Sequence, residues 1–270
     1  MKSLSNTLQN IIRGEVKQVS IEILNEMIKN IGSTDPILRD QLIFSAFCAL
    51  IFGEQLNKQE MEYILNSLLE KQLIILDIEE TNSDAVFTRS FTSLVYAAFL
   101  EYDATKKVID GQLVRQVMDT SHDYMAREMD LRGYVKNKGW AHATAHGADL
   151  LESIAKHPVS TPQDASIILG NIARFIKIAE GYQDEEEERL ARAFIALGTH
   201  HLTEEMLKEW LVILEQDLWT KKITDNSDLK PYYSQLAFKN FLKSTYFLME
   251  KKSLQGDLKG EIKKLVVKLI

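Results

Sequence analysis

The sequence has little cysteine and little proline: Cys48 is the one cysteine, and four prolines occur in 270 residues. With one cysteine, no disulfide bond can form within the chain. Cys48 lies in the apolar run QLIFSAFCALIF, residues 41–52, and a buried thiol of this kind suits a reducing compartment. Because no stretch rich in proline, glycine and serine divides the sequence, we expect one continuous domain over residues 1–270.

The sequence also lacks long apolar runs and clusters of positive charge. No stretch approaches the roughly 20 apolar residues that a membrane-spanning helix needs. The first 15 residues lack the apolar core of a secretory signal. The formal net charge is −7, whereas recognition of a nucleic-acid backbone needs a basic surface. We therefore predict a cytoplasmic protein that binds neither membranes nor nucleic acids.

Apolar residues with helical spacing occur almost throughout the sequence. After residue 165 they are spaced by three and four positions, as one face of a helix requires: Ile168, Leu169, Ile172, Phe175, Ile176 and Ala179. Thr161 and Pro162 are typical of a helix start, and Gly181 of a helix end. Residues 73–78 have some strand character, but they more simply end a helix. The sequence therefore predicts an all-α fold.

The predicted helices come in pairs that are joined by short turns. Helix–turn–helix units recur at intervals of roughly 40 residues, which is the length of a HEAT repeat. No sequence signature repeats, so this interpretation depends on spacing alone. We expect stacked antiparallel helical hairpins that form a HEAT-like α–α superhelix.

The most informative segment is GWAHATAHGADLL, residues 139–151. It places His142, His146 and Asp149 at i, i+4 and i+7, which is one face of a single predicted helix. Trp140 belongs to the apolar face of that helix and is predicted to lie in the core. Because the other faces are apolar or small, we expect the polar stripe to line a cleft or to bond with buried partners.

Candidate partners for this stripe lie upstream. A predicted helix from about residue 110 to 129 carries Asp119, His122 and Asp123 away from its apolar face. Consecutive helices usually pack antiparallel, so the polar stripes of the two helices are expected to meet. The connection between the helices adds further candidates, in which the arginine can bridge to a carboxylate: Glu128, Asp130, Arg132 and Tyr134.

These residues allow three interpretations. In the first, they form a hydrogen-bonded network that only ties helices together. In the second, His142, His146 and Asp149 bind a divalent metal, because a His-x₃-His pair on a helix can hold zinc. In the third, Arg132 and the imidazoles hold a phosphate or carboxylate ligand.

The metal interpretation has further candidate ligands in His122 and Asp123. The sequence departs from the zinc-protease pattern, however, because Ala143 stands where those enzymes have a glutamate after the first histidine. Nucleophilic catalysis has little support, since no GxSxG elbow occurs.

The segment RGYVKNKGWAHATAHGADLL, residues 132–151, resembles the signature of a bacterial family catalogued as domain of unknown function 2785. The resemblance covers residues 128–158, and the segments DEEEERLARAF and VFTRSF are similar to weaker motifs of the same family. The resemblance implies an all-helical bacterial protein, and it implies no particular reaction.

We expect an interaction or scaffold protein that binds a protein or peptide partner and has a His/Asp-lined polar cleft. The candidate ligand-binding residues are Glu128, Arg132, Tyr134, Trp140, His142, His146 and Asp149. The alternative is a metal-dependent hydrolase, or a protein that binds a small anionic ligand, in which the two histidines and Asp149 form the site. The sequence identifies no cofactor beyond this divalent metal, and it leaves the oligomeric state open.

Overall fold

The computed structural model describes residues 2–16, 18–220 and 228–269. Helices make up most of these residues, so the predicted all-α fold is confirmed. The chain divides into two compact units, residues 1–159 and residues 160–270, and each is described separately. The expected single domain and the expected HEAT-like superhelix stay predictions.

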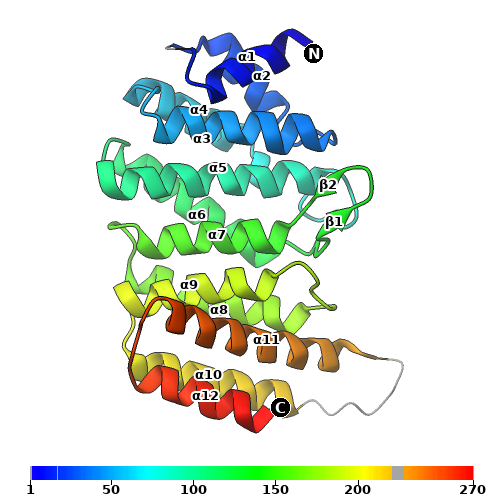
Figure 1. The fold of residues 1–270 in the computed structure, drawn as a ribbon, viewed down its shortest axis with the longest axis vertical. Coiled ribbons are helices and arrows are strands. Elements are labelled where there is room, and N and C mark those ends of the chain that lie inside the picture. Colours follow the sequence, from blue (N-terminus) through cyan, green and yellow to red (C-terminus); the bar gives the residue numbers. More distant parts are fainter. Residues whose placement is uncertain (1, 17, 221–227, 270) are drawn as a thin grey trace. The chain divides into compact units, whose positions relative to one another are not determined.

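The first unit consists of helices and one small hairpin (Figure 1). Its α-helices are α1 (Lys2–Ile12), α2 (Ile21–Lys29), α3 (Ser45–Phe52), α4 (Lys58–Glu70), α5 (Ala85–Lys106), α6 (Gly111–Arg127) and α7 (Ala143–Lys156). A π-helix, Ile37–Phe44, leads directly into α3, and a 3₁₀ turn, Leu73–Ile75, follows α4. Residues 73–78 therefore end a helix, as expected, and do not form a strand.

Side-chain caps set several of the helix starts. In the capping box before α4, Asn57 Oδ1 accepts a hydrogen bond from the backbone N–H of Glu60 at 3.0 Å, and Glu60 Oε2 accepts one from the N–H of Asn57 at 2.8 Å. Asp110 accepts hydrogen bonds from the first N–H groups of α6. Since these N–H groups have no partner inside the helix, a cap of this kind stabilises a helix by about 1 kcal/mol.

Helix α5 is the central helix of the first unit. It packs against α3, α6 and α7, and its contact with α7 is the most extensive (Figure 1). Residues on all sides of α5 are buried, and the buried set includes polar side chains: Arg89, Ser90, Thr92 and Ser93. A helix that is covered all round must satisfy its polar groups inside the protein. These side chains therefore shape the site described below.

The short β-hairpin between α6 and α7 is not predicted from the sequence. Strand β1 (Tyr134–Val135) pairs antiparallel with β2 (Gly139–Trp140), and Tyr134 lies opposite Trp140. Two-residue strands are too short to show an alternating pattern. Gly139 has a φ of +76°, and a Cβ at this position would lie 2.7 Å from the Cβ of Pro36. The hairpin can therefore approach the π-helix only because residue 139 is glycine.

The second unit contains α8 (Pro162–Ile178), α9 (Glu186–His200), α10 (Glu204–Thr220), α11 (Lys230–Lys251) and α12 (Asp257–Leu269). Thr161 and Asp164 form a capping box at the start of α8, which confirms the helix start predicted at Thr161. Helix α11 is central, because it contacts each of the other four helices. Its buried Phe238 and Phe241 form an aromatic core with Phe194 of α9.

Within the described residues, every helix is too short or too polar to cross a membrane.

Cys48 is half-buried in α3, and burial raises the pKa of its thiol to about 11. The thiol therefore stays protonated near neutral pH and is a poor nucleophile.

Candidate functional site

His142 does not lie on the helix that carries His146. It is the residue before α7, and its backbone is left-handed, with φ 49° and ψ 34°. The backbone N–H of His142 donates to the carbonyl of Arg132 at 3.0 Å, and that of Ala141 donates to Gly133 at 2.9 Å. These bonds continue the pairing of the hairpin, so the chain is extended up to residue 141. The prediction that one helix face carries both histidines and Asp149 is therefore wrong.

The side chain of His142 belongs to a row of aromatic rings. His142 stacks on Trp140 with ring centroids 4.4 Å apart and an angle of 20° between the planes. Tyr134 packs edge-on against Trp140, with ring centroids 5.1 Å apart. On the inner side, His142 lies 5.6 Å from His146, which in turn lies 5.1 Å from Phe91 of α5. We call these five residues the aromatic row.

The aromatic row runs from the surface to the core. Tyr134 is 60% exposed and Trp140 is 39% exposed, whereas Phe91 is buried. The prediction that Trp140 lies in the core is therefore wrong. Its assignment to the apolar face assumed a helix, but Trp140 lies in β2, where successive side chains point to opposite faces.

His146 is oriented by a serine of α5. Its Nδ1 lies 2.7 Å from Oγ of Ser90, and the Ser90 hydroxyl donates to the carbonyl of Ala141. Because the hydroxyl has a single proton, Nδ1 must be the donor to Ser90 and carries the ring proton. This direction is the reverse of that in a Ser–His catalytic pair, where the serine donates to the imidazole. Ser90 is also fully buried, so the pair orients the ring.

Glu128 forms a buried ion pair beneath the hairpin. Both its carboxylate and the Arg89 guanidinium are fully buried, with Nε–Oε2 at 2.7 Å and Nη2–Oε1 at 2.8 Å. Oε1 also accepts from the backbone N–H groups of Met129 and Asp130. Arg89 Nη1 donates to the carbonyls of Leu76, at 3.0 Å, and Asp77. Glu128, predicted as a ligand-binding residue, therefore fixes the chain after α6.

Arg132 bridges to a carboxylate, as expected, and that carboxylate is Asp130. Its Nε and Nη2 donate to the two Asp130 oxygens at 2.8 Å and 2.6 Å. Nη2 also donates to the carbonyl of Ser83, and Asp130 Oδ2 accepts from the N–H of Asn82. The arginine is thus used to hold the loop before α5 against the start of the hairpin. Protein acceptors therefore occupy Nε and Nη2 of Arg132.

A third arginine, Arg39, holds the other end of the hairpin and was missed from the sequence. It is fully buried in the π-helix, and its Nη2 donates to the carbonyls of Lys138, at 2.8 Å, and Trp140, at 3.3 Å. The guanidinium also covers the rings of Phe87 and Phe91, 4.3 Å and 4.7 Å from their centroids. The sequence gives little signal for this role, because Arg39 stands beside Asp40 and Gln41 in the segment ILRDQLIF and resembles an ordinary polar position of a helix.

The predicted metal ligands are not gathered at one point. His122 is buried in α6, and the exposed Asp123 pairs with Arg127 at 2.9 Å. Helix α7 packs mainly on α5 and makes a smaller contact with α6, so the expected meeting of the α6 and α7 polar stripes stays a prediction. The other three predicted ligands are His142, His146 and the half-buried Asp149. Within the described residues, no three of these five side chains have ligand atoms within 4.8 Å of one another.

Comparison with known proteins identifies the family. The model of the family described as "Protein of unknown function (DUF2785)" matches residues 74–247, which is more than half of the chain. No curated protein and no solved structure matches the sequence. The aromatic row and the Arg89–Glu128 pair lie inside the matched segment, and Arg39 lies outside it. The chain therefore belongs to the DUF2785 family.

Proposed function

We propose that this protein is a cytoplasmic interaction or scaffold protein of the helical-repeat kind, which binds a protein or peptide partner at Tyr134 and Trp140. One observation carries the proposal: two large aromatic side chains are exposed on a hairpin whose backbone is held by hydrogen bonds from buried side chains. Tyrosine and tryptophan are the residues most enriched at binding hot spots, because they contribute a large contact area with few rotatable bonds.

The base of the hairpin supports this role. Arg39 bonds to the carbonyls of Lys138 and Trp140, while Arg132 and Glu128 hold the chain at the other end. Trp140 is further restrained by its stack on His142. A surface that is already ordered loses little conformational entropy when a partner binds. Arg39, Arg132 and Glu128 therefore contribute to binding indirectly, because they hold Tyr134 and Trp140 in place.

The experiment places a photo-reactive benzoylphenylalanine at Tyr134 in cells that express the full chain. We expect a discrete cross-linked partner, and we expect Trp140→Ala in the same chain to abolish it. Benzoylphenylalanine at Phe52, which is 47% exposed in α3 of the same unit, is the matched control and should not give this product. A product that survives Trp140→Ala, or that forms equally at Phe52, contradicts the proposal.

The alternative function, a metal-dependent hydrolase or an anion-binding protein using His142, His146 and Asp149, has a separate test. Elemental analysis of protein purified without an affinity tag measures bound metal directly, with His142→Ala as the control. We expect the two proteins to contain the same trace amounts of metal. Stoichiometric metal that disappears in His142→Ala would favour the alternative.

A further inference from the structure

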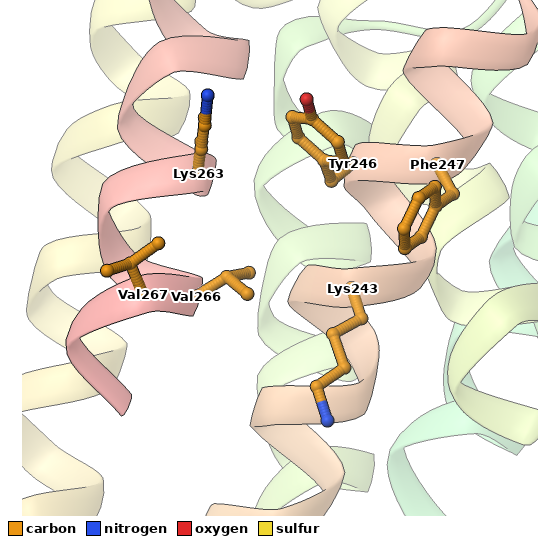
Figure 2. Close-up of a pocket in the computed structure, with 6 residues that line it drawn as sticks. All are labelled: Lys243, Tyr246, Phe247, Lys263, Val266 and Val267. Carbon is orange, nitrogen blue, oxygen red and sulfur yellow. The ribbon is translucent and has the colours of Figure 1, made fainter. Parts of the chain in front are cut away.

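Two grooves flank helix α12 in the second unit. The first, of about 150 Å³, lies between α11 and α12, and we call it the basic groove (Figure 2); its lining is Lys243, Tyr246, Phe247, Lys263, Val266 and Val267. The second, of about 520 Å³, lies between α10 and α12, and we call it the acidic groove; its lining is Glu205, Lys208, Glu209, Val212, Ile213 and Glu261. Both grooves combine apolar and charged side chains.

The two grooves carry opposite charge. The basic groove has two lysines and no acidic residue, a formal charge of +2. The acidic groove has three glutamates and one lysine, but Glu205 pairs with Lys208 at 2.6 Å and Glu261 pairs with Lys264 at 3.0 Å, so its unpaired charge among the described residues is that of Glu209. Lys243 and Lys263 extend in opposite directions (Figure 2) and form no ion pair within residues 2–16, 18–220 and 228–269. Glu209 likewise has no basic partner in that part of the chain. Each groove therefore holds charge that the unit itself leaves uncompensated.

Large apolar side chains are exposed on each of the three helices. Ile213 of α10 is 56% exposed, Phe247 of α11 is 66% exposed and Val267 of α12 is 69% exposed. Each of these residues lines one of the two grooves. Exposed apolar side chains that occur together with uncompensated charge are typical of a protein-binding surface.

We infer that a second copy of this chain docks on the α10–α12–α11 face and forms a symmetric dimer. This face is complementary to itself. A twofold axis that runs along α12 in the plane of contact places the basic groove of one protomer opposite the acidic groove of its partner, and the reverse. Lys243 and Lys263 of each protomer then face the unpaired Glu209 of its partner, and Val267 of each protomer is covered at the centre.

This inference does not depend on the proposed function. The proposed partner site lies in the first unit, at Tyr134 and Trp140, whereas the dimer face lies in the second. Helix α12 also lies beyond residue 247, where the match to the family ends. We propose a second copy as the occupant because the basic groove and the acidic groove lie on the two sides of α12, so one chain carries both of the opposite charges.

Sedimentation velocity of the full chain over a range of protein and salt concentrations tests the inference. We expect a monomer–dimer equilibrium that high salt weakens, since the grooves meet through charge. Val267→Glu should abolish the dimer. Ile21→Glu, at a residue of α2 that is 42% exposed in the first unit, is the matched control and should dimerise as the parent does.

A charge exchange identifies the pairing of the two grooves. Lys263→Glu brings a carboxylate opposite Glu209 of the partner and removes the net positive charge of the basic groove, and we expect the dimer Kd to rise about tenfold or more. Combining Lys263→Glu with Glu209→Lys puts opposite charges back at these two positions, and this double variant should recover most of the lost affinity. A parent protein that stays monomeric overturns the inference. A dimer that survives Val267→Glu, or a double variant no better than Lys263→Glu, overturns it as well.

Discussion

The carboxylate of Glu128 is held by hydrogen bonds in a site that solvent does not reach. Two come from the guanidinium of Arg89 and two from the backbone N–H groups of Met129 and Asp130. Burying a charge costs free energy, which a partner in good geometry offsets. Removing one member of such a pair leaves the other charged and unpaired in the interior. The pair is therefore far more sensitive to a single substitution than any ion pair at the surface.

We expect Glu128→Ala to lower the free energy of unfolding by about 3–5 kcal/mol. The physical reason is that Arg89 keeps its charge and loses both carboxylate oxygens. Urea denaturation followed by circular dichroism measures the change. Asp123→Ala removes a carboxylate that pairs with Arg127 on the surface, and this control should leave the stability nearly unchanged. Equal effects of the two substitutions would contradict the prediction.

His157 forms the other buried pair with a titratable group. Its Nε2 lies 3.3 Å from Oδ2 of Asp103 in α5, and its Nδ1 accepts from the N–H of Val159. Since Nδ1 is an acceptor, the ring proton lies on Nε2 and the imidazole is neutral. Burial lowers the pKa of His157, and the nearby Asp103 only partly opposes this effect. The folded state therefore binds a proton here less readily than the unfolded chain does.

The lowered pKa of His157 predicts that acid destabilises the protein through this residue. Above pH about 6.5, the unfolded imidazole is neutral too, and its contribution to stability is fully present. As the pH falls below that value, the unfolded chain takes up the proton first, so the free energy of unfolding decreases until the folded pKa is reached. Denaturation at several pH values between 8 and 5 should show a smaller loss for His157→Gln than for the parent. An unchanged pH dependence would argue against this role.

Two glycines show how the packing of whole helices sets the effect of one methyl group. Gly147 lies in α7 against α6, and a Cβ there would come within 2.8 Å of Cε of the fully buried Met125. Gly170 lies in α8, and a Cβ there would meet nothing within 4 Å. Both positions are inside helices, where alanine is intrinsically preferred to glycine. The neighbouring helix alone distinguishes them.

We expect Gly147→Ala to destabilise the protein by about 1–3 kcal/mol, because the buried Met125 side chain must shift within a packed interior to admit the new methyl group. Gly170→Ala should stabilise it by about 0.5–1 kcal/mol, because the helix gains propensity at no steric cost. Thermal denaturation of the two variants measures both signs. A stabilising Gly147→Ala would show that α6 and α7 are not packed as closely as described.

The arrangement of helices also explains which part of the site could be predicted. The start of α8 follows from two adjacent residues, Thr161 and Pro162, so the sequence predicted it. The partner of α7 could not be predicted in this way. The expected partner was the preceding helix, α6, but the main contact is with α5. Packing between helices is non-local, and the rule that neighbours in sequence pack together holds only on average.

At the scale of the whole molecule, the expected single domain is open to a direct test. Tryptophan provides a reporter in each part, since Trp140 lies in the first unit and Trp210 and Trp219 lie in the second. A single domain predicts that variants which retain only Trp140, or only the other two, unfold at the same urea concentration. Phe241→Ala, in the core of the second unit, should then shift both transitions together, by about 3–5 kcal/mol. Transitions that separate would show two domains.

By itself, the sequence determined that the protein is helical and where several helices begin, because helical spacing and caps involve residues only three or four positions apart. It also indicated that residues 128–151 contain the candidate site. The tertiary structure alone decided what that segment is: a hairpin held by Arg39, Arg89 and Arg132, with His142 outside the helix and Trp140 at the surface. These outcomes depend on carbonyls and carboxylates brought together from distant parts of the chain, and no local pattern records them.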